Sequence, residues 1–551
     1  MKSYQLFKFF CILFVLLAFS TEITAQNLEK EVDTFLSSEY PSDAPGVIVL
    51  IAKEGQPIYR KAFGMADLEL KVPMQPSNVI EIGSITKQFT VVAILMLEEQ
   101  GKLKIEDAIT KYIPEYPTQG KTITIHQLLN HTSGIRSYTD MPSFQKMART
   151  DMTPTEIIDA FKNEPMDFDP GEKFLYNNSG YILLGHIIEV VSGQTYADFI
   201  QKNIFDVVGM TDSYYGSMKT LIPNRASGYS RNENGYSNAD YLSLTLPYAA
   251  GAIMSTIDDM LKWQNALSAN SLVKKTSMEK AIHGSSLNNG EPINYGYGLE
   301  EADINGSRSI QHGGGIFGYT TMGIFLPEED MYVIALSNCD CGNVNAAALK
   351  IAAMAIGKPF PDKKDAIALS EAQLKKWVSV YQFEDEVIRY VTFENGKLFS
   401  QREGSSILEI YPMAENNFIF DGGNTSYEFS MKDGKKEAKF TSGKTIAIGK
   451  EIDKVNPSVK TTINLASEVL AQYVGKYELQ PGFIMDITTK DQQIFAQLTG
   501  QPQLEIFAEK EDTFFLKVVE AQLVFDKNDE GKVKSLTLHQ GGQQLPAKKI
   551  E

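Results

Sequence analysis

The chain has only three cysteines among its 551 residues, which excludes the small secreted folds that several disulfides hold together. Two of them, Cys339 and Cys341, are separated by a single residue. A Cys-x-Cys pair alone is a weak indication of a metal or redox site, so we expect two partly buried thiols. Stability is then expected to come from a large core, which a chain of this length permits.

The chain also has fewer positively charged than negatively charged residues. Lys and Arg total 52 against 69 Asp and Glu, which gives a formal net charge of −17. An acidic surface repels phosphate backbones, so nucleic acid is not an expected partner. Hydrophobic residues make up 43% and charged residues 22%, a globular composition that argues against disorder, collagen or coiled coil. The length suits about three to four domains.

No apolar run is long enough to span a bilayer, which takes about 20 residues. The longest, Phe9–Phe19, has eleven residues; it follows Lys2 and Lys8 and leads through a more polar stretch to Ala25. This pattern is typical of a cleaved signal peptide, with a membrane anchor as the alternative. We expect residues 1–25 to be removed and the mature chain, without a membrane span, to be periplasmic or secreted.

Residues 26–358 mix helical and strand patterns. The expected elements are a helix at Asn27–Phe35, a hairpin of Val47–Ala52 and Pro57–Phe63, a buried helix at Phe89–Leu97, a hairpin of Thr320–Phe325 and Met331–Ser337, and a closing helix at Val344–Ile356. A Gly stop signal at Gly101 follows the buried helix.

After a linker that begins at Pro359, the sequence repeats itself at a spacing of 96 residues. The aligned pairs include Trp377/Tyr473, Tyr381/Tyr477, Leu398/Ile494, Gly404/Gly500, Phe418/Phe514 and Phe429/Phe525. Short alternating runs between Asn, Asp and Gly turns predict β-structure in each copy. We expect two duplicated all-β small barrels, at residues 359–455 and 456–551.

Ser84 and Lys87 form a Ser-x-x-Lys pair at the start of the predicted buried helix. Positions i and i+3 share a helix face, so the amine can reach the hydroxyl. A serine needs such a base to become a nucleophile, and a helix N-terminus favours negative charge developing there. The same spacing recurs at Ser143/Lys146, Ser271/Lys274 and Ser277/Lys280. The pair is therefore weak evidence alone, and a capping serine is the alternative.

Tyr176 and Asn178 follow a turn at Pro170-Gly171, on what we expect to be a short extended segment. A buried tyrosine beside a lysine ammonium would have its phenolate favoured and could accept a proton. The asparagine offers a donor and an acceptor to a substrate amide. Taken alone, the pair is better explained by a core tyrosine and a turn asparagine.

His312, Gly314 and Gly315 belong to a Gln-His-Gly-Gly-Gly segment at the start of the last predicted hairpin. Glycines let a ligand lie close to a strand and let backbone N–H groups point at it. Two converging N–H groups would form an oxyanion hole. The alternatives are a tight turn and a structural histidine.

Together and in this order, the three motifs resemble those of the penicillin-recognising serine hydrolases. That family includes class C β-lactamases, DD-carboxypeptidases, related esterases and D-aminopeptidases. The flanking segments Leu128–Gly134, Pro170-Gly171 and Val208–Met210 support the resemblance. It implies an α+β, β-lactamase/transpeptidase-like domain at 26–358, with an antiparallel sheet flanked by helices. D-aminopeptidase-like members also carry two β-barrel domains after the catalytic one, similar to the two repeats here.

The resemblance implies that Ser84 is the acylated nucleophile. It further implies that Lys87 and Tyr176 share the transfer of protons to and from Ser84, and it leaves open which of the two is the base. No metal and no cofactor is implied.

The resemblance also assigns the substrate contacts. Asn178 would orient the substrate amide, and His312 and Gly314 would belong to the strand that pairs with the substrate. The backbone N–H groups of Ser84 and Gly315 would form the oxyanion hole.

One motif departs from the pattern of class C β-lactamases, which usually carry Lys-Thr-Gly where this chain has His312-Gly313-Gly314. A permanent cation is replaced by a group whose charge depends on pH. If His312 held a substrate carboxylate by its charge, binding would weaken above about pH 6.5.

The sequence thus predicts an exported serine hydrolase that acts through an acyl-enzyme on D-amino-acid peptides, peptidoglycan fragments or small esters and amides. One alternative is a β-lactamase. The other is a non-catalytic binding or sensor protein on the same fold. The expected partner is a small-molecule or peptide substrate, and a homo-oligomer is compatible with the sequence.

Overall fold

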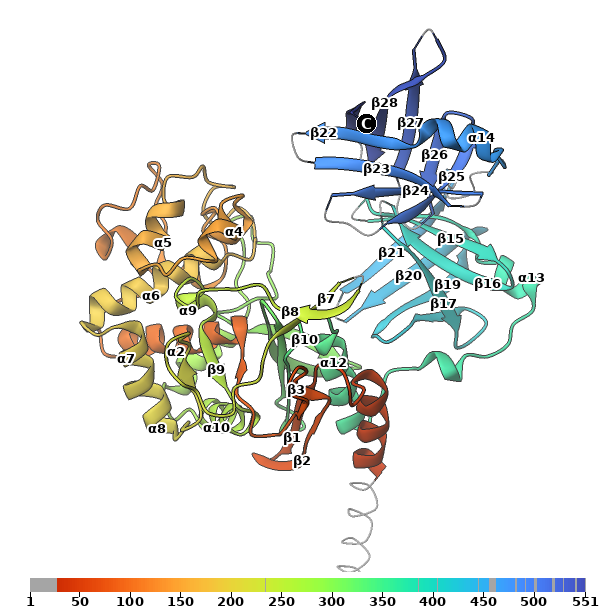
Figure 1. The fold of residues 1–551 in the computed structure, drawn as a ribbon. Coiled ribbons are helices and arrows are strands. Elements are labelled where there is room, and N and C mark those ends of the chain that lie inside the picture. The colour runs from red at the N-terminus through yellow and green to blue at the C-terminus, as the bar shows by residue number, and fades with distance from the viewer. Residues whose placement is uncertain are drawn as a thin grey trace, which may run out of the picture. The chain divides into compact units, whose positions relative to one another are not determined.

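The computed structural model describes residues 27–550, except 233, 385, 404, 444, 455–461, 481–482, 491, 500–502, 518–520, 529 and 541–542. The signal peptide predicted at 1–25, the boundary predicted at 455/456 and the pair Gly404/Gly500 lie outside the described residues. Among the described helices, none is long and apolar enough to cross a membrane. The chain divides into two compact units, Met1–Phe360 and Pro361–Glu551 (Figure 1).

The first unit is built on a six-stranded antiparallel sheet with the strand order β10-β11-β12-β13-β1-β2. The strands are β1 (Val47–Lys53), β2 (Gln56–Phe63), β10 (Glu300–Ile304), β11 (Ser307–Ile316), β12 (Tyr319–Leu326) and β13 (Met331–Ser337). Both predicted hairpins are present, as β1–β2 and β12–β13. The last strand pairs with the first, so the two ends of this unit meet in the sheet centre.

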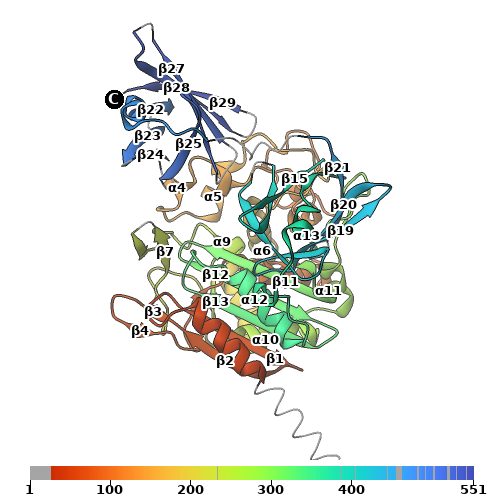
Figure 2. The same ribbon diagram turned by 90° about the vertical axis from the view of Figure 1, so that its right-hand side faces the viewer.

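Both faces of the sheet are covered. The helix of residues 27–39 and α12 (Val344–Ala355) pack on one face, where Val47, Val49 and Ile51 of β1 join their core (Figure 2). The alternate residues Ile48 and Leu50 join the core on the other face. Because each such side chain contributes about 1.5–3 kcal/mol when fully buried, the unbroken apolar run of β1 fixes it at the sheet centre.

The second face carries α2 (Thr86–Glu99), α6 (Asn178–Ser192) and α10 (Ile257–Ser268). The buried helix predicted at Phe89–Leu97 is thus confirmed with one further turn at its start. A 3₁₀ turn, Gly83–Ile85, runs directly into it. Gly101 follows its end at a φ of 70°, a left-handed conformation that glycine adopts without strain.

The second unit contains two closed antiparallel barrels, β14–β21 and β22–β29, so the two predicted small barrels are confirmed. The first comprises β14 (Ser379–Phe383), β15 (Ile388–Glu394), β16 (Lys397–Arg402), β17 (Ile407–Pro412), β18 (Asn417–Phe420), β19 (Thr425–Lys432), β20 (Lys435–Ser442) and β21 (Thr445–Ile452). The second comprises β22 (Gly475–Gln480), β23 (Phe483–Lys490), β24 (Gln493–Leu498), β25 (Leu504–Lys510), β26 (Thr513–Leu516), β27 (Ala521–Lys527), β28 (Val533–Gln540) and β29 (Gln543–Lys549).

The repeated residues take equivalent places in the two barrels. The hydroxyl of Tyr381 donates a hydrogen bond to the carbonyl of Trp377 at 2.8 Å, and the hydroxyl of Tyr477 donates to Tyr473 at 2.7 Å. All four side chains are buried. The two barrels therefore repeat the same core, which accounts for the 96-residue spacing in the sequence.

Cys339 and Cys341 form a disulfide, so the prediction of two partly buried thiols was wrong. The chain turns directly after β13, which brings their Cα atoms to 5.2 Å, within the range that a disulfide spans. Local backbone shape brought them together, which the spacing alone did not indicate.

Candidate active site

Ser84 lies in the 3₁₀ turn that leads into α2, and Lys87 is the second residue of α2. The Nζ atom of Lys87 lies 3.0 Å from the Oγ atom of Ser84. Ser84 is half-buried, whereas Lys87 is 0% exposed. The i, i+3 spacing therefore places an amine beneath a hydroxyl that remains accessible.

The buried amine of Lys87 has two further partners. Its Nζ atom lies 2.9 Å from the Oδ1 atom of Asn178 and 2.9 Å from the carbonyl oxygen of Ala250. Burial holds the pKa of Lys87 well below its usual range, because desolvation disfavours the ammonium. No carboxylate forms an ion pair with Lys87 among the described residues to offset that cost. Burial therefore favours the neutral amine of Lys87 more strongly than in a solvated lysine.

Tyr176 covers this amine, with Nζ of Lys87 4.8 Å from its ring centre. Burial raises the pKa of Tyr176 well above its usual range, and the nearby Ser84 hydroxyl offsets this only in part. The direction is opposite to the one expected, because the desolvation of the buried phenol outweighs any stabilisation of its phenolate. The Tyr176 hydroxyl makes no well-formed hydrogen bond to the described residues, and it is a protonated phenol at neutral pH.

Asn178 begins α6 and does not lie on an extended segment, in contrast to the prediction. Asn177 is extended and caps the helix, its side-chain oxygen accepting a hydrogen bond from Gly180 N at 2.8 Å. The Asn178 amide is held at both ends, since Nδ2 donates to Thr139 Oγ1 at 3.2 Å while Oδ1 accepts from Lys87.

The glycines of β11 bring its backbone against the Ser84 turn. A Cβ atom on Gly314 would lie 2.0 Å from the Ile82 carbonyl oxygen, whereas one on Gly315 would meet nothing within 4 Å. Gly83 has a φ of 51°, and a Cβ atom there would approach Gly315 N to 3.0 Å. Gly83 and Gly314 thus permit the close approach that sets Gly315 beside Ser84.

His312 is buried, and both of its ring nitrogens are occupied. Nδ1 lies 2.6 Å from the Gly313 carbonyl, which can only accept, so Nδ1 carries the proton. Nε2 then accepts from the Tyr295 hydroxyl at 2.9 Å. Burial, together with nearby Lys87, lowers the pKa of His312 to about 4. A pKa in this range favours the neutral histidine at pH 6.5, which argues against a hold on a substrate carboxylate through its charge.

Two cavities meet at Ser84 and Gly315. One, of about 600 Å³, also contains Tyr176, Tyr295 and His312. The other, of about 410 Å³, contains Asn178 and a mostly apolar wall that includes Phe144, Leu246 and Phe317. A nucleophile at the junction of two cavities suits a substrate with a group on each side of its scissile bond.

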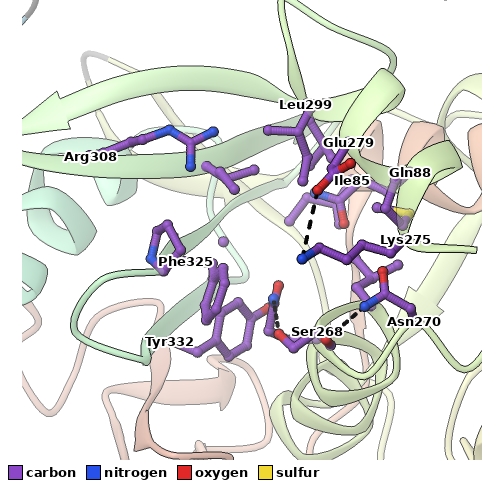
Figure 3. A pocket seen from close by; sticks show the side chains of 17 residues that line it. Ile85, Gln88, Ser268, Asn270, Lys275, Glu279, Leu299, Arg308, Phe325 and Tyr332 are labelled. Carbon is purple, nitrogen blue, oxygen red and sulfur yellow. Dashed lines mark hydrogen bonds and ion pairs between the residues drawn. The ribbon is translucent and has the colours of Figure 1, made fainter.

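A third cavity, of about 270 Å³, lies between α10, α11 (Lys275–Ile282) and the sheet (Figure 3). Ile85 and Gln88 reach it from the serine-bearing segment, and Phe325 and Tyr332 form part of its wall. Neither Ser84 nor Lys87 lines this cavity. It is separate from the candidate active site.

The structure thus brings together all seven predicted site residues, from the Ser84 turn, α2, the segment that leads into α6, α6 itself and β11. Sequence reasoning missed Tyr295, the partner of His312, and the Ala250 carbonyl, the partner of Lys87. A backbone carbonyl leaves no trace in a sequence, because every residue type has one. Tyr295 sits in an Asn-Tyr-Gly-Tyr-Gly segment, a pattern that equally suits a loop.

Known proteins resemble this chain over most of its length. Residues 30–358 match the family model described as Beta-lactamase, and residues 459–549 match a Domain of unknown function (DUF3471). Penicillin-binding protein 4* of Bacillus subtilis (strain 168) is 32% identical over 430 residues, which cover 74% of this chain and 94% of that protein.

Solved structures of other proteins also resemble this chain. The octameric penicillin-binding protein homologue from Pyrococcus abyssi is 27% identical, with a TM-score of 0.55, and covers 76% of this chain and 99% of its own. D-amino acid amidase from Ochrobactrum anthropi SV3, at 24% identity and a TM-score of 0.54 over 60% of this chain and 99% of its own, shares the fold. The chain therefore belongs to the β-lactamase and penicillin-binding protein family of serine hydrolases.

Proposed function

We propose that this chain hydrolyses its substrate through an acyl-enzyme on Ser84, with Lys87 as the general base. The observation that carries the proposal is the set of three partners around Nζ of Lys87. Two of them, Asn178 Oδ1 and the Ala250 carbonyl, can only accept hydrogen bonds. They take both protons of a neutral amine, so its lone pair points at the third partner, Ser84 Oγ.

The acylation step follows from this geometry. Ser84 Oγ forms a bond to the substrate carbonyl carbon as its proton passes to Nζ of Lys87. Collapse of the tetrahedral intermediate breaks the bond to the leaving group, which takes up a proton from the lysine directly or through the Tyr176 hydroxyl. Water then attacks the acyl-enzyme with the same base, and Ser84 is restored.

The backbone N–H groups of Ser84 and Gly315 complete the proposal as the oxyanion hole. Ser84 lies in the first turn of a helical segment, where N–H groups lack helical partners. Gly315 is held beside it by the close contact of β11 with Gly83. Removing one such donor typically costs about 10²–10³ in kcat.

We propose D-amino-acid peptides and amides, peptidoglycan fragments or small esters as substrates. The relatives named as penicillin-binding proteins support a site that accepts acyl donors of this kind. Initial rates on D-alanyl peptides, D-amino-acid amides, short esters and a chromogenic cephalosporin would rank these classes. Every activity should disappear in Ser84→Ala, whereas Ser143→Ala, which has the same spacing to a lysine, should keep it. Activity that survives Ser84→Ala would contradict the proposal.

The two alternatives are less well supported. A β-lactamase would need a group that holds the β-lactam carboxylate, and the neutral His312 does not supply a charge for it. A non-catalytic binding protein would have no need of a buried, neutral lysine aimed at a serine. Hydrolysis of the cephalosporin in preference to esters and amides would favour the first alternative, and an inert Ser84 the second.

We further propose that the chain is exported and self-associates. The Cys339–Cys341 disulfide supports export, because cytosolic thiols are usually kept reduced. N-terminal sequencing of the mature protein should begin at Gln26. The octameric homologue supports self-association, and light scattering should give a mass above that of one chain.

A further inference from the structure

The two cavities beside Ser84 carry acidic but no basic side chains. Glu300 lines the larger cavity and Asp340 the smaller. Neither lysine nor arginine lines either one among the residues that the structure describes. Lys87 lies behind Ser84, fully buried, and lines neither cavity.

Asp340 already has partners, because it accepts hydrogen bonds from Ser230 Oγ and from Gly318 N, each at 2.8 Å. Glu300 differs. It is the first residue of β10, it is exposed, and its carboxylate forms no ion pair with the described part of the chain. It is the one acidic wall group of these cavities with no protein partner assigned to it there.

Backbone pairing fixes where Glu300 sits. It lies opposite Gln311 of β11, next to His312 in the sequence, and it bridges to Tyr295 on its other side. The pKa of Tyr295 is raised mainly by burial, and the charge of Glu300 contributes to the same direction. The Tyr295 hydroxyl in turn donates to His312 Nε2. Glu300 thus lines the larger cavity together with Ser84, on the strand beside His312 and Tyr295.

His312 does not offer a positive charge to a ligand in this cavity. Its Nδ1 proton is used by the Gly313 carbonyl and its Nε2 lone pair by Tyr295, so neither nitrogen is left for a substrate carboxylate. The larger cavity therefore favours a positive charge and repels a negative one.

We propose that Glu300 is a specificity-determining residue that binds the ammonium group of the substrate. The substrate class is then an amide or ester that carries a free amine, rather than one that ends in a carboxylate. This inference rests on the proposed function, because it concerns the same cavity. The charge complementarity itself can be tested without turnover.

The test uses the full chain with Ser84→Ala, which cannot form an acyl-enzyme. Titration calorimetry at pH 6.5 measures the Kd of D-phenylalanine amide, whose α-amino group, with a pKa of about 7.7, is protonated. N-acetyl-D-phenylalanine amide serves as the uncharged ligand and N-acetyl-D-phenylalanine as the anionic one. Glu300→Gln removes the charge at nearly constant shape. Glu328→Gln, an exposed change at the β12–β13 turn outside both cavities, is the matched control.

Glu300→Gln should weaken binding of D-phenylalanine amide about three- to fivefold, the upper part of the range for an exposed charge pair. Binding of the N-acetyl amide should change less than about twofold, and Glu328→Gln should alter neither ligand. The inference is overturned if Glu300→Gln weakens both amides equally, if the anion binds best, or if D-phenylalanine amide shows no saturable binding. Failure of Ser84 acylation in the unmutated chain would instead overturn the proposed function and leave the ammonium site standing.

Discussion

The chemistry of single residues in this site depends on burial without counter-charge. Lys87, His131 and His312 are all buried, and burial lowers the pKa of each. The same burial raises the pKa of Tyr176. Burial therefore favours the neutral form of each of these four side chains. An amine in its neutral form accepts a proton and a neutral phenol donates one, which supports the proposed division of the two roles between Lys87 and Tyr176.

Replacing Lys87 tests the first of these roles. Lys87→Met removes the base, and acylation by a chromogenic ester should slow by about 10²–10⁴-fold, the usual contribution of general base catalysis. Stopped-flow measurement of the burst phase gives the rate constant. Lys146→Met, at the same spacing from Ser143 but exposed, should leave the rate unchanged. A burst rate preserved in Lys87→Met would show that another group is the base.

The pH dependence of acylation tests the neutral lysine. The reactive form is the free amine, so the rate falls as the pH drops through the pKa of Lys87 and is constant above it. Because burial puts this pKa well below the usual range, the rate should be flat between pH 9 and 11. An ordinary lysine would give a rate that climbs up to about pH 10.4, and such a climb would contradict the assignment. His312 should add no step between pH 5.5 and 7.5.

At the scale of elements, the site is a contact between one strand and one helical turn. Thr321 Oγ1 of β12 donates to the Ile82 carbonyl at 2.9 Å, and Gly314 of β11 packs against the same carbonyl. The neighbouring strands β11 and β12 therefore hold the Ser84 turn in place. The position of Gly315 beside Ser84 depends on this close packing.

Adding a methyl group to this contact should disrupt it. Gly314→Ala places Cβ 2.0 Å from the Ile82 carbonyl oxygen and 2.3 Å from Thr321 Oγ1, so β11 must move away. We expect a loss of about 1–3 kcal/mol in unfolding free energy, with a loss of acylation rate. Gly315→Ala, one residue on and open to the cavity, is the control and should unfold like the unmodified chain. Equal stability of both variants in urea unfolding would contradict the packing.

Several elements of the first unit could be predicted from local patterns. Alternation and turn residues indicate the two hairpins, and an apolar run with a following glycine indicates α2. Asn178 was misplaced because its helix begins with a cap formed by Asn177, and an Asn-Asn pair does not indicate which of the two caps. The pairing of β13 with β1 could not be predicted, since it joins residues nearly 300 positions apart.

At the scale of the whole molecule, the chain combines one catalytic unit with a duplicated barrel. The duplication was visible in sequence because each barrel keeps its aromatic core at the same spacing. The disulfide was not, because its formation depends on the turn after β13. The net negative charge of the chain does not by itself indicate a substrate. Only Glu300 and Asp340, which line the two cavities, relate that charge to the proposed site.

Because the two barrels are duplicates, equivalent substitutions in them should have equal effects on stability. Tyr381→Phe and Tyr477→Phe each remove a buried hydroxyl that donates to a backbone carbonyl four residues earlier. Each should lower the unfolding free energy of the barrel unit by about 1 kcal/mol, a typical value for one hydrogen bond. Denaturant unfolding of the full chain, with esterase activity as a control for the catalytic unit, measures both. A loss confined to one variant would mean that the two cores are not equivalent.

The central claim, that Ser84 is the acylated nucleophile, is tested most directly by locating the adduct of an activity-based serine probe. The full chain is incubated with the probe, digested, and its peptides are mapped by mass. The account predicts one adduct, on the peptide that contains Ser84, and none in Ser84→Ala. It also predicts no adduct on the peptides with Ser143, Ser271 or Ser277, which share the spacing to a lysine. An unlabelled Ser84 across a range of pH, or an adduct that persists in Ser84→Ala, would contradict it.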